Sequence, residues 1–129
     1  MANQPAPNQP RLDPPISNLI AEAAGSADSG MLITDVQGVI QWCNAAFSRD
    51  SGYSSEELIG KKPGILKSGL MPDSFYASLW ETLLSGGHWR GEFTNRRKNG
   101  ALYFDESFIT PLKNEQGEVT HFFAIKVDI

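Results

Sequence analysis

The stretch WRGEFTNRRKNGALYFDESFITPLKNEQGEVTHFFAIKVD, residues 89–128, decides the fold of this chain. Asn99 and Gly100 form the strongest two-residue signal for a β-hairpin, and residues 114–117 have the composition of a second turn. The segments between these turns are rich in aromatic and β-branched residues, which favour strands. The pattern predicts three consecutive antiparallel strands over residues 89–97, 102–112 and 119–128.

Side chains on a strand alternate between the two faces of its sheet, so the sequence assigns each residue to a face. Trp89, Gly91, Phe93 and Asn95 share one face of the first strand, and their composition marks this face as the buried one. Asn95 therefore places an amide at the end of an apolar row. An unpaired buried amide costs about 1–3 kcal/mol, so it needs partners, which either a ligand or a neighbouring backbone group could supply.

The second and third strands are apolar on both faces. On the second strand, Tyr103 and Ile109 lie opposite to Phe104 and Phe108. A sheet that is apolar on both sides must be covered on both sides. We expect the central helices to cover one face, and an N-terminal helix, a second subunit or both to cover the other. This pattern predicts a homodimer that forms through the outer face of the sheet and the N-terminal helix.

Residues 29–88 are expected to form two strands followed by a group of mostly short helices. Asn44 is a helix cap, Ser54 and Glu57 match a capping box, and Pro72 suits the first turn of a longer helix. The last helix has a broad apolar face made of Phe75, Tyr76, Leu79, Trp80, Leu83 and Leu84. The predicted elements are strands at 31–34 and 39–43, helices at 45–50, 54–60 and 72–84, and a loop at 60–71. Together with the three C-terminal strands they make an α+β domain over residues 29–129.

The segment before this domain divides into two parts. Residues 1–15 hold five of the eight prolines and are predicted to be a flexible arm. Apolar residues then recur at helical spacing, which predicts a short amphipathic helix over residues 16–25.

Composition excludes several classes of protein. The chain has 129 residues and a formal net charge of -4, without the basic face that nucleic-acid binding requires. It has no apolar run long enough for a membrane span and no signal peptide, so we expect a cytoplasmic location. One cysteine and two histidines are too few for a disulfide framework or a Cys/His zinc site. No phosphate-binding loop or nucleophile–base arrangement is present, and we expect no enzymatic activity.

Four segments together resemble a PAS domain, the sensor module of bacterial and eukaryotic signalling proteins. They are ITDVQGVIQWCNAAF at 33–47, GYSSEELIGK at 52–61, WRGEFTNRRKNGALY at 89–103 and ITPLKNEQGEVTHFFAIKVDI at 109–129. The resemblance covers about residues 30–129. It implies a five-stranded antiparallel sheet with helices on one face and an N-terminal flanking helix, with room for a ligand between sheet and helices. It also implies that the chain continues into an output domain, as in two-component systems.

Within this family, residues 66–100 look most like the flavin-binding redox sensors of the NifL type, which hold FAD; light-oxygen-voltage (LOV) domains are a related branch. Asn95 matches an asparagine that hydrogen-bonds the flavin ring in LOV domains, Asp105 falls where they carry a second asparagine, and Lys126 where they carry a glutamine. Trp89 resembles a tryptophan that lines the site in the redox sensors. The resemblance implies a cofactor site made of Asn95, Trp89, Asp105, Lys126, Phe93, Ile65, Leu66 and Lys67.

Two departures from the LOV pattern change the expected chemistry. The photoreactive cysteine of LOV domains falls on Pro63, and Cys43 lies on an early strand, so a flavin–cysteinyl photocycle is not expected. Asp105 and Lys126 both point inward, and because unpaired buried charges are costly they should pair. Two roles remain open for this pair: tuning of a reduced flavin by Lys126, or a plain cross-strand ion pair without a ligand.

The sequence therefore predicts a sensory domain that binds FAD non-covalently, detects redox state or oxygen, and signals to a partner subunit or an output domain. FMN, another small ligand and a cofactor-free dimerisation module are the alternatives. Haem is disfavoured because the predicted helix at residues 72–84 carries no histidine, while His88 and His121 lie after it.

Overall fold

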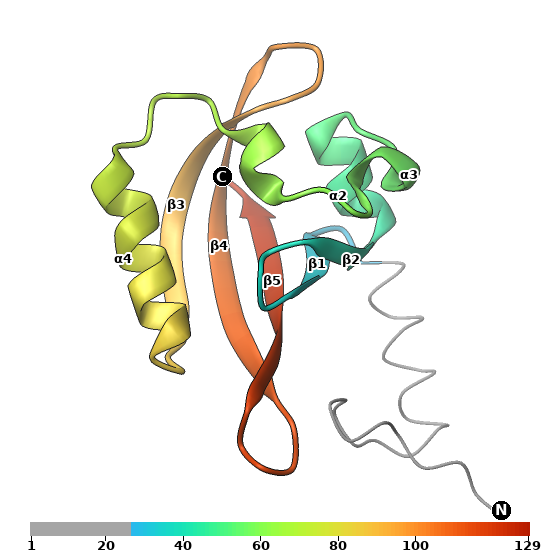
Figure 1. Cartoon of the computed structure of the whole chain (residues 1–129). Coiled ribbons are helices and arrows are strands. Elements are labelled where there is room, and N and C mark those ends of the chain that lie inside the picture. The colour runs from blue at the N-terminus through green and yellow to red at the C-terminus, as the bar shows by residue number, and fades with distance from the viewer. Residues whose placement is uncertain (1–26) are drawn as a thin grey trace, which may run out of the picture.

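The computed structural model describes residues 27–129, so the expected arm and amphipathic helix lie outside the described residues. Figure 1 shows the chain in this structure. Its elements in chain order are β1 (Gly30–Asp35), β2 (Ile40–Cys43), α2 (Ala45–Ser51), α3 (Ser55–Leu58), the 3-10 helix η1 (Pro63–Leu66), α4 (Asp73–Leu84), β3 (Trp89–Arg96), β4 (Leu102–Lys113) and β5 (Val119–Asp128). In the part of the chain that the structure describes, no helix is both long and apolar enough to cross a membrane.

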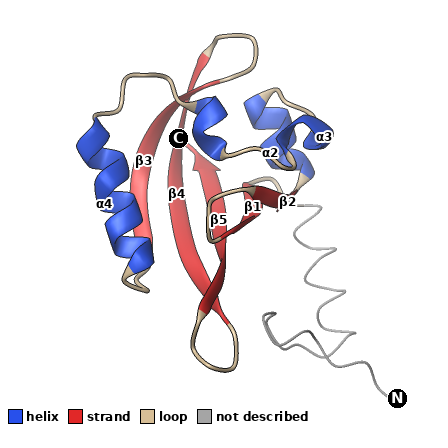
Figure 2. Cartoon of the chain, in the orientation of Figure 1, coloured by secondary structure: helices blue, strands red, loops and turns tan. Residues whose placement is uncertain are grey.

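The five strands form one antiparallel sheet in the order β2-β1-β5-β4-β3. The helices and η1 lie over one face of this sheet (Figure 2). The first and last strands pair along their length, with Gly30 opposite Lys126 and Asp35 opposite His121, which places β5 at the centre. The expected α+β architecture, a five-stranded antiparallel sheet with helices on one face, is confirmed.

The turns between β1 and β2, between β3 and β4 and between β4 and β5 share one hydrogen-bonding pattern. In the β4–β5 turn, Asn114 N–H donates to the Glu118 carbonyl and Gly117 N–H to the Asn114 carbonyl. The β3–β4 turn repeats this pattern with Gly100, whose φ is +92°. The hairpin predicted at Asn99 and Gly100 is therefore confirmed, with β3 and β4 paired on either side of this turn. Gly100 alone supplies its positive φ, since no described residue other than glycine has one.

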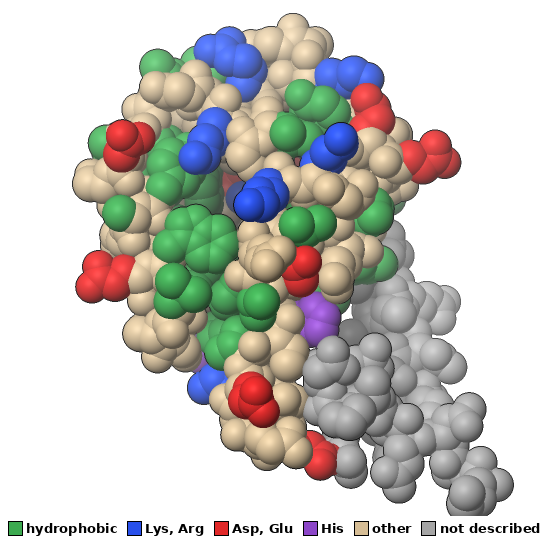
Figure 3. Space-filling view, in the orientation of Figure 1, with side chains coloured by type: hydrophobic (Ala, Val, Ile, Leu, Met, Phe, Trp, Pro, Cys, Tyr) green, Lys and Arg blue, Asp and Glu red, His purple; other side chains and the backbone are tan. Residues whose placement is uncertain are grey.

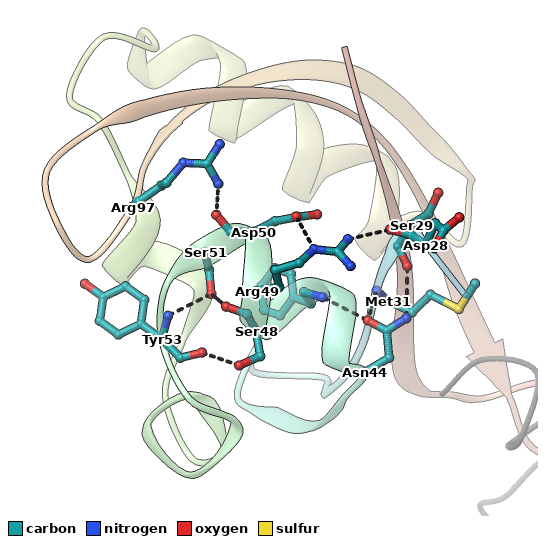
Figure 4. A network of polar contacts seen from close by, with 11 residues as sticks. Asp28, Ser29, Met31, Asn44, Ser48, Arg49, Asp50, Ser51, Tyr53 and Arg97 are labelled. Carbon is teal, nitrogen blue, oxygen red and sulfur yellow. Dashed lines mark hydrogen bonds and ion pairs between the residues drawn. The ribbon is translucent and has the colours of Figure 1, made fainter. Parts of the chain in front are cut away.

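The predicted helix caps are confirmed, and one of them also fixes the start of the sheet. The Asn44 Oδ1 accepts from Phe47 N–H at 3.0 Å and from Met31 N–H at 2.8 Å, while its Nδ2 donates to the Ser29 carbonyl at 2.9 Å (Figure 4). The same side chain thus caps α2 and holds β1. At α3, Ser54 and the N3 glutamate form a reciprocal capping box.

Polar contacts also tie α2 to the β3–β4 hairpin. The Arg97 guanidinium donates to the Asp50 carbonyl at the end of α2, and Arg49 reaches the Asp28 carbonyl at 2.9 Å (Figure 4). The α2 end, the hairpin and the entry into β1 are therefore held as one unit.

The helix α4 covers β3 and β4 with a narrower apolar face than the sequence predicts. Leu79 and Leu83, one helical turn apart, are buried, and Phe75 and Tyr76 are half-buried. Leu84 is 72% exposed, so its predicted place in the core is wrong. A helix that lies flat on a sheet buries a single stripe, and Leu84 follows Leu83 by about 100° around the axis.

The outer face of the sheet carries exposed apolar side chains. Leu102, Phe104 and Val127 are 40%, 47% and 37% exposed on strands whose alternate residues are buried. The prediction that both faces of β4 are apolar therefore holds, and no described helix covers this outer face.

Candidate functional site

A cavity of about 220 Å³ lies between the inner face of the sheet and the helical layer. Strands supply one wall with Leu32, Thr34, Phe93, Asn95, Ile109, Phe122, Ala124 and Lys126. Opposite them lie Leu66 and the buried stripe of α4, with Tyr76, Leu79, Trp80 and Leu83. The rim is formed by Gln37, Gly38, Lys62, Pro63, Gly64 and Lys67. Figure 3 views this side of the molecule, where hydrophobic side chains gather between α4 and the β1–β2 turn.

A buried polar network stands on the inner face of the sheet beside the cavity. The Lys126 Nζ donates to Ser107 Oγ at 2.8 Å and lies 3.5 Å from Asp105 Oδ1. Ser107 Oγ in turn donates to the same carboxylate oxygen at 2.6 Å, and Asn95 Nδ2 reaches its other oxygen at 3.4 Å. The predicted pairing of Asp105 with Lys126 is therefore confirmed.

Lys126 is the charged group that this network presents to the cavity. It is 9% exposed, and its Nζ lies 4.2 Å from the centroid of the Phe93 ring. Burial lowers the pKa of Lys126, and the attraction of Asp105 opposes this shift. An ammonium in this position favours a ligand that brings acceptors or negative charge to the same end of the cavity.

Two lining residues have unused hydrogen-bonding capacity. Among residues 27–129, the Tyr76 hydroxyl is buried without a hydrogen-bond partner. The Asn95 side chain makes a long 3.4 Å contact to Asp105 and interacts with the Tyr103 hydroxyl, which leaves part of its amide capacity unused. Buried polar groups are normally paired, so a polar molecule in the cavity would satisfy them.

Five of the eight predicted site residues line the cavity: Phe93, Asn95, Lys126, Leu66 and Lys67. They come from β3, β5 and the segment around η1, which are distant in sequence. Two of them are polar groups of the sheet wall, Asn95 and Lys126, two are apolar, Phe93 and Leu66, and Lys67 lies at the rim.

The other three predicted residues lie elsewhere. The Trp89 indole folds back over Gly91 and packs edge-on against Phe75 at 5.3 Å, inside the aromatic core. Asp105 lies behind Lys126, which takes the position at the cavity wall. Ile65 is 40% exposed, because successive residues of the short η1 turn point in different directions and Leu66 takes the buried one.

The indole that lines the cavity belongs to Trp80, whose helical spacing predicts a place in the core. Trp80 is 37% exposed and packs edge-on against Phe122 with ring centroids 5.9 Å apart. A Cβ added to Gly38 would lie 3.2 Å from this indole, so the β1–β2 turn approaches α4 closely here. Helical spacing marks Trp80 as apolar-facing, but only the sheet beneath α4 determines that it borders a cavity.

Comparison with known proteins agrees with this architecture. A profile of the family described as "PAS domain" matches residues 28–129. The chain is 39% identical over 103 residues to a nitrogen fixation regulatory protein of Klebsiella oxytoca, covering 80% of this chain and 21% of that protein. It is 34% identical over 96 residues to the aerotaxis receptor of Escherichia coli, covering 74% of this chain and 19% of that protein. The chain thus spans about a fifth of these relatives.

Solved structures show the same fold. The PAS domain of a protein from Colwellia psychrerythraea superposes with a TM-score of 0.81 at 25% identity, covering 88% of this chain and 97% of that one. An RNA-binding light-oxygen-voltage receptor superposes with a TM-score of 0.82 at 22% identity, covering 93% of this chain and 36% of that one. With the family profile spanning the whole described sheet and its helices, this chain belongs to the PAS domain family.

Proposed function

We propose that this PAS domain is a sensor that binds FAD non-covalently in the cavity and responds to redox state or oxygen. The observation that carries the proposal is an apolar cavity with a carboxamide, Asn95, and an ammonium, Lys126, at its sheet wall. Such a pocket, mostly apolar with a few polar groups that fix orientation, is typical of cofactor sites. A bound flavin would supply exchange of electrons and protons at its ring.

The size and lining of the cavity suit the ring part of such a cofactor. Its volume of about 220 Å³ is below the range of about 300–1,000 Å³ usual for complete ligand sites, so a dinucleotide would extend through the mouth. Phe93 and Trp80 offer aromatic surface, while Asn95, Lys126 and the unpaired Tyr76 hydroxyl offer hydrogen bonds.

The residues around Lys126 offer a means of response. Its ammonium is shared between Ser107 and Asp105 within a desolvated site, so added negative charge in the cavity would draw it away from the carboxylate. Lys126 lies on β5, at the centre of the sheet between β1 and β4. A displacement of Lys126 would shift β5, and the outer face of β5 would pass this shift to a partner subunit or an output domain in contact with it. This requires two discrete arrangements of the sheet or dimer, biased by the ligand.

Lys126 is also proposed to favour an anionic reduced cofactor. The substitution Lys126→Met keeps an unbranched side chain, one atom shorter, and removes its charge. If the role is real, the midpoint potential of the bound flavin becomes more negative, because a nearby positive charge stabilises the anion. An unchanged potential would remove this role and leave a structural ion pair.

Identification of the cofactor is the direct test of the proposal. Purified chain should be yellow, and the molecule released on denaturation should be FAD by chromatography and mass. Asn95→Ala should lower flavin retention, whereas Glu92→Gln, an exposed change on the opposite face of β3, should not. Colourless protein that also fails to take up added flavin would refute the proposal.

Haem fits this cavity less well, since neither described histidine lines it. His88 contacts Thr110 at 3.1 Å and His121 contacts Thr120 at 2.9 Å. A protein that binds haem would show an intense Soret band in place of the flavin spectrum.

The second candidate is a cofactor-free module that works through dimerisation. The exposed Phe104, Leu102 and Val127 on the outer sheet face favour it, and homodimerisation through this face is part of both proposals. Mass measurement in solution should give a dimer that Phe104→Glu dissociates. We propose further that the domain is cytoplasmic, has no enzymatic activity of its own, and acts through an output domain in the full-length protein.

A further inference from the structure

The cavity has room for only part of a dinucleotide. Its volume of about 220 Å³ suits a ring system, so the adenosine half of FAD would lie on the surface around the mouth. A nucleobase on a protein surface is held by an aromatic face on which it stacks and by a polar group that bonds its edge. The side chains around the mouth therefore determine whether a dinucleotide binds more tightly than a mononucleotide.

An indole with free surface lies at this mouth. Trp80 lines the cavity and is 37% exposed. The ring packs edge-on against Phe122, and a Cβ built on Gly38 would lie 3.2 Å from it. Gly38 is buried although it belongs to the β1–β2 turn, as expected for a glycine that the indole covers. Because the ring is held on two sides, stacking on its exposed part would cost little side-chain entropy.

The β1–β2 turn places an apolar and a polar side chain next to Gly38. Val36 is 44% exposed, and Figure 3 shows hydrophobic side chains gathered between this turn and α4. Gln37 is exposed at the rim of the cavity, and its backbone N–H donates to Asp35 Oδ1 at 2.9 Å. Within residues 27–129, the side-chain amide of Gln37 makes no hydrogen bond. A free carboxamide can donate to the edge of an adenine and accept from it at the same time.

We propose that Trp80 and Gln37 form a nucleobase subsite at the mouth, which binds the adenine of FAD and makes the site prefer FAD over FMN. The inference rests on the proposed flavin site and assigns residues to the second half of the ligand. Stacking of a base on an aromatic side chain is worth about 1–3 kcal/mol, a factor of about 5–160 in affinity. Because only part of the Trp80 ring is free, we expect the lower end of this range, a preference for FAD of about 5-fold.

The test is a titration of flavin-free protein with FMN and with FAD, followed by the change in flavin fluorescence. Both ligands carry the ring and a phosphate, so the ratio of their affinities isolates the contribution of the adenosine half. Trp80→Leu keeps an apolar cover over Gly38 but removes the aromatic face, and it should bring the ratio close to that of a site without preference. Trp80→Phe keeps an aromatic ring and should retain part of the preference.

Two more variants complete the experiment. Gln37→Ala should lower the ratio by about 2-fold or more, the value of one neutral hydrogen bond. Leu84→Ala is the matched control and should leave the ratio unchanged, because Leu84 is an exposed apolar residue of the same helix that does not line the cavity. If Trp80→Leu fails to fold, Trp80→Phe and Gln37→Ala still test the subsite, since each removes less of the packing.

Equal affinities of the wild type for FAD and FMN would overturn the subsite alone. The same conclusion would follow if Trp80→Leu weakened both ligands by one factor, since the indole would then act only as a wall of the cavity. A loss of the preference in Leu84→Ala would also contradict the assignment to Trp80. Failure of both flavins to bind the wild type would instead refute the flavin site itself, and the subsite with it.

Discussion

The buried Asp105–Lys126 pair allows a quantitative test of the site, through a double-mutant cycle on stability. The perturbations are Lys126→Met, Asp105→Asn and both together. Each single change leaves the other charge buried, since the two side chains are only 10% and 5% exposed. In Lys126→Met, the carboxylate keeps Ser107 and the long contact to Asn95, and in Asp105→Asn the ammonium keeps Ser107 and the Phe93 ring.

The distance between the charges sets the expected size of the effect. At 3.5 Å and an effective dielectric constant of about 20, their attraction is about 5 kcal/mol. Desolvation of two ions costs several kcal/mol each, so the pair contributes little net stability, yet removing one partner should cost about 3–5 kcal/mol. The double variant should cost less than the sum of the two single variants by about 3 kcal/mol or more.

The assay is urea unfolding of the four proteins, with the slope against urea concentration as a check on two-state behaviour. The pH dependence gives a second readout. An unperturbed lysine has a pKa of 10.5, and burial lowers the pKa of Lys126 below this value in the folded chain. The unfolded chain therefore holds this proton to higher pH than the folded chain does. The stability of the wild type should therefore rise as pH increases through the lowered pKa toward 10.5, and Lys126→Met should lack this rise.

Additive losses in the cycle would refute the reasoning, because they would mean that the two charges do not interact in the folded chain. Single variants as stable as the wild type would refute it as well, since they would show that each charge reaches water without its partner.

Three further predictions concern the core around the site. Burial, with a contribution from Asp105, raises the pKa of Tyr103, so stability should fall above about pH 10 as the unfolded phenol ionises, and Tyr103→Phe should reduce this fall in urea unfolding against pH. Leu66→Ala should cost about 2–5 kcal/mol, because Leu66 is 1% exposed, while Ile65→Ala should cost under about 1 kcal/mol, and equal losses would contradict the assignment of Leu66 to the cavity wall. Gly91→Ala should cost about 1–3 kcal/mol and shift the fluorescence of the Trp89 region, because its Cβ would lie 2.4 Å from the Trp89 ring; a neutral effect would show that the indole moves freely.

Local patterns in the sequence determined most of the fold. The positions of β3, β4 and β5 follow from turn residues and alternation, and the caps of α2 and α3 follow from Asn44 and Ser54. These features depend on contacts within a few residues of each other, which the chain specifies by itself. The resemblance to LOV domains placed Asp105 and Lys126 on the inner face, and the cost of burying charge then required them to pair.

The tertiary structure alone decided which of these residues meet the cavity. Trp89 and Trp80 are both apolar-facing indoles, but Trp89 folds over Gly91 into the aromatic core, while Trp80 reaches the mouth beside Gly38. Lys126, rather than Asp105, takes the place at the wall. A cavity is the space that remains after side chains from five or more segments have packed, so its lining depends on where α4 and η1 settle on the sheet. That placement is a sum of long-range contacts, and no periodicity within a single segment encodes it.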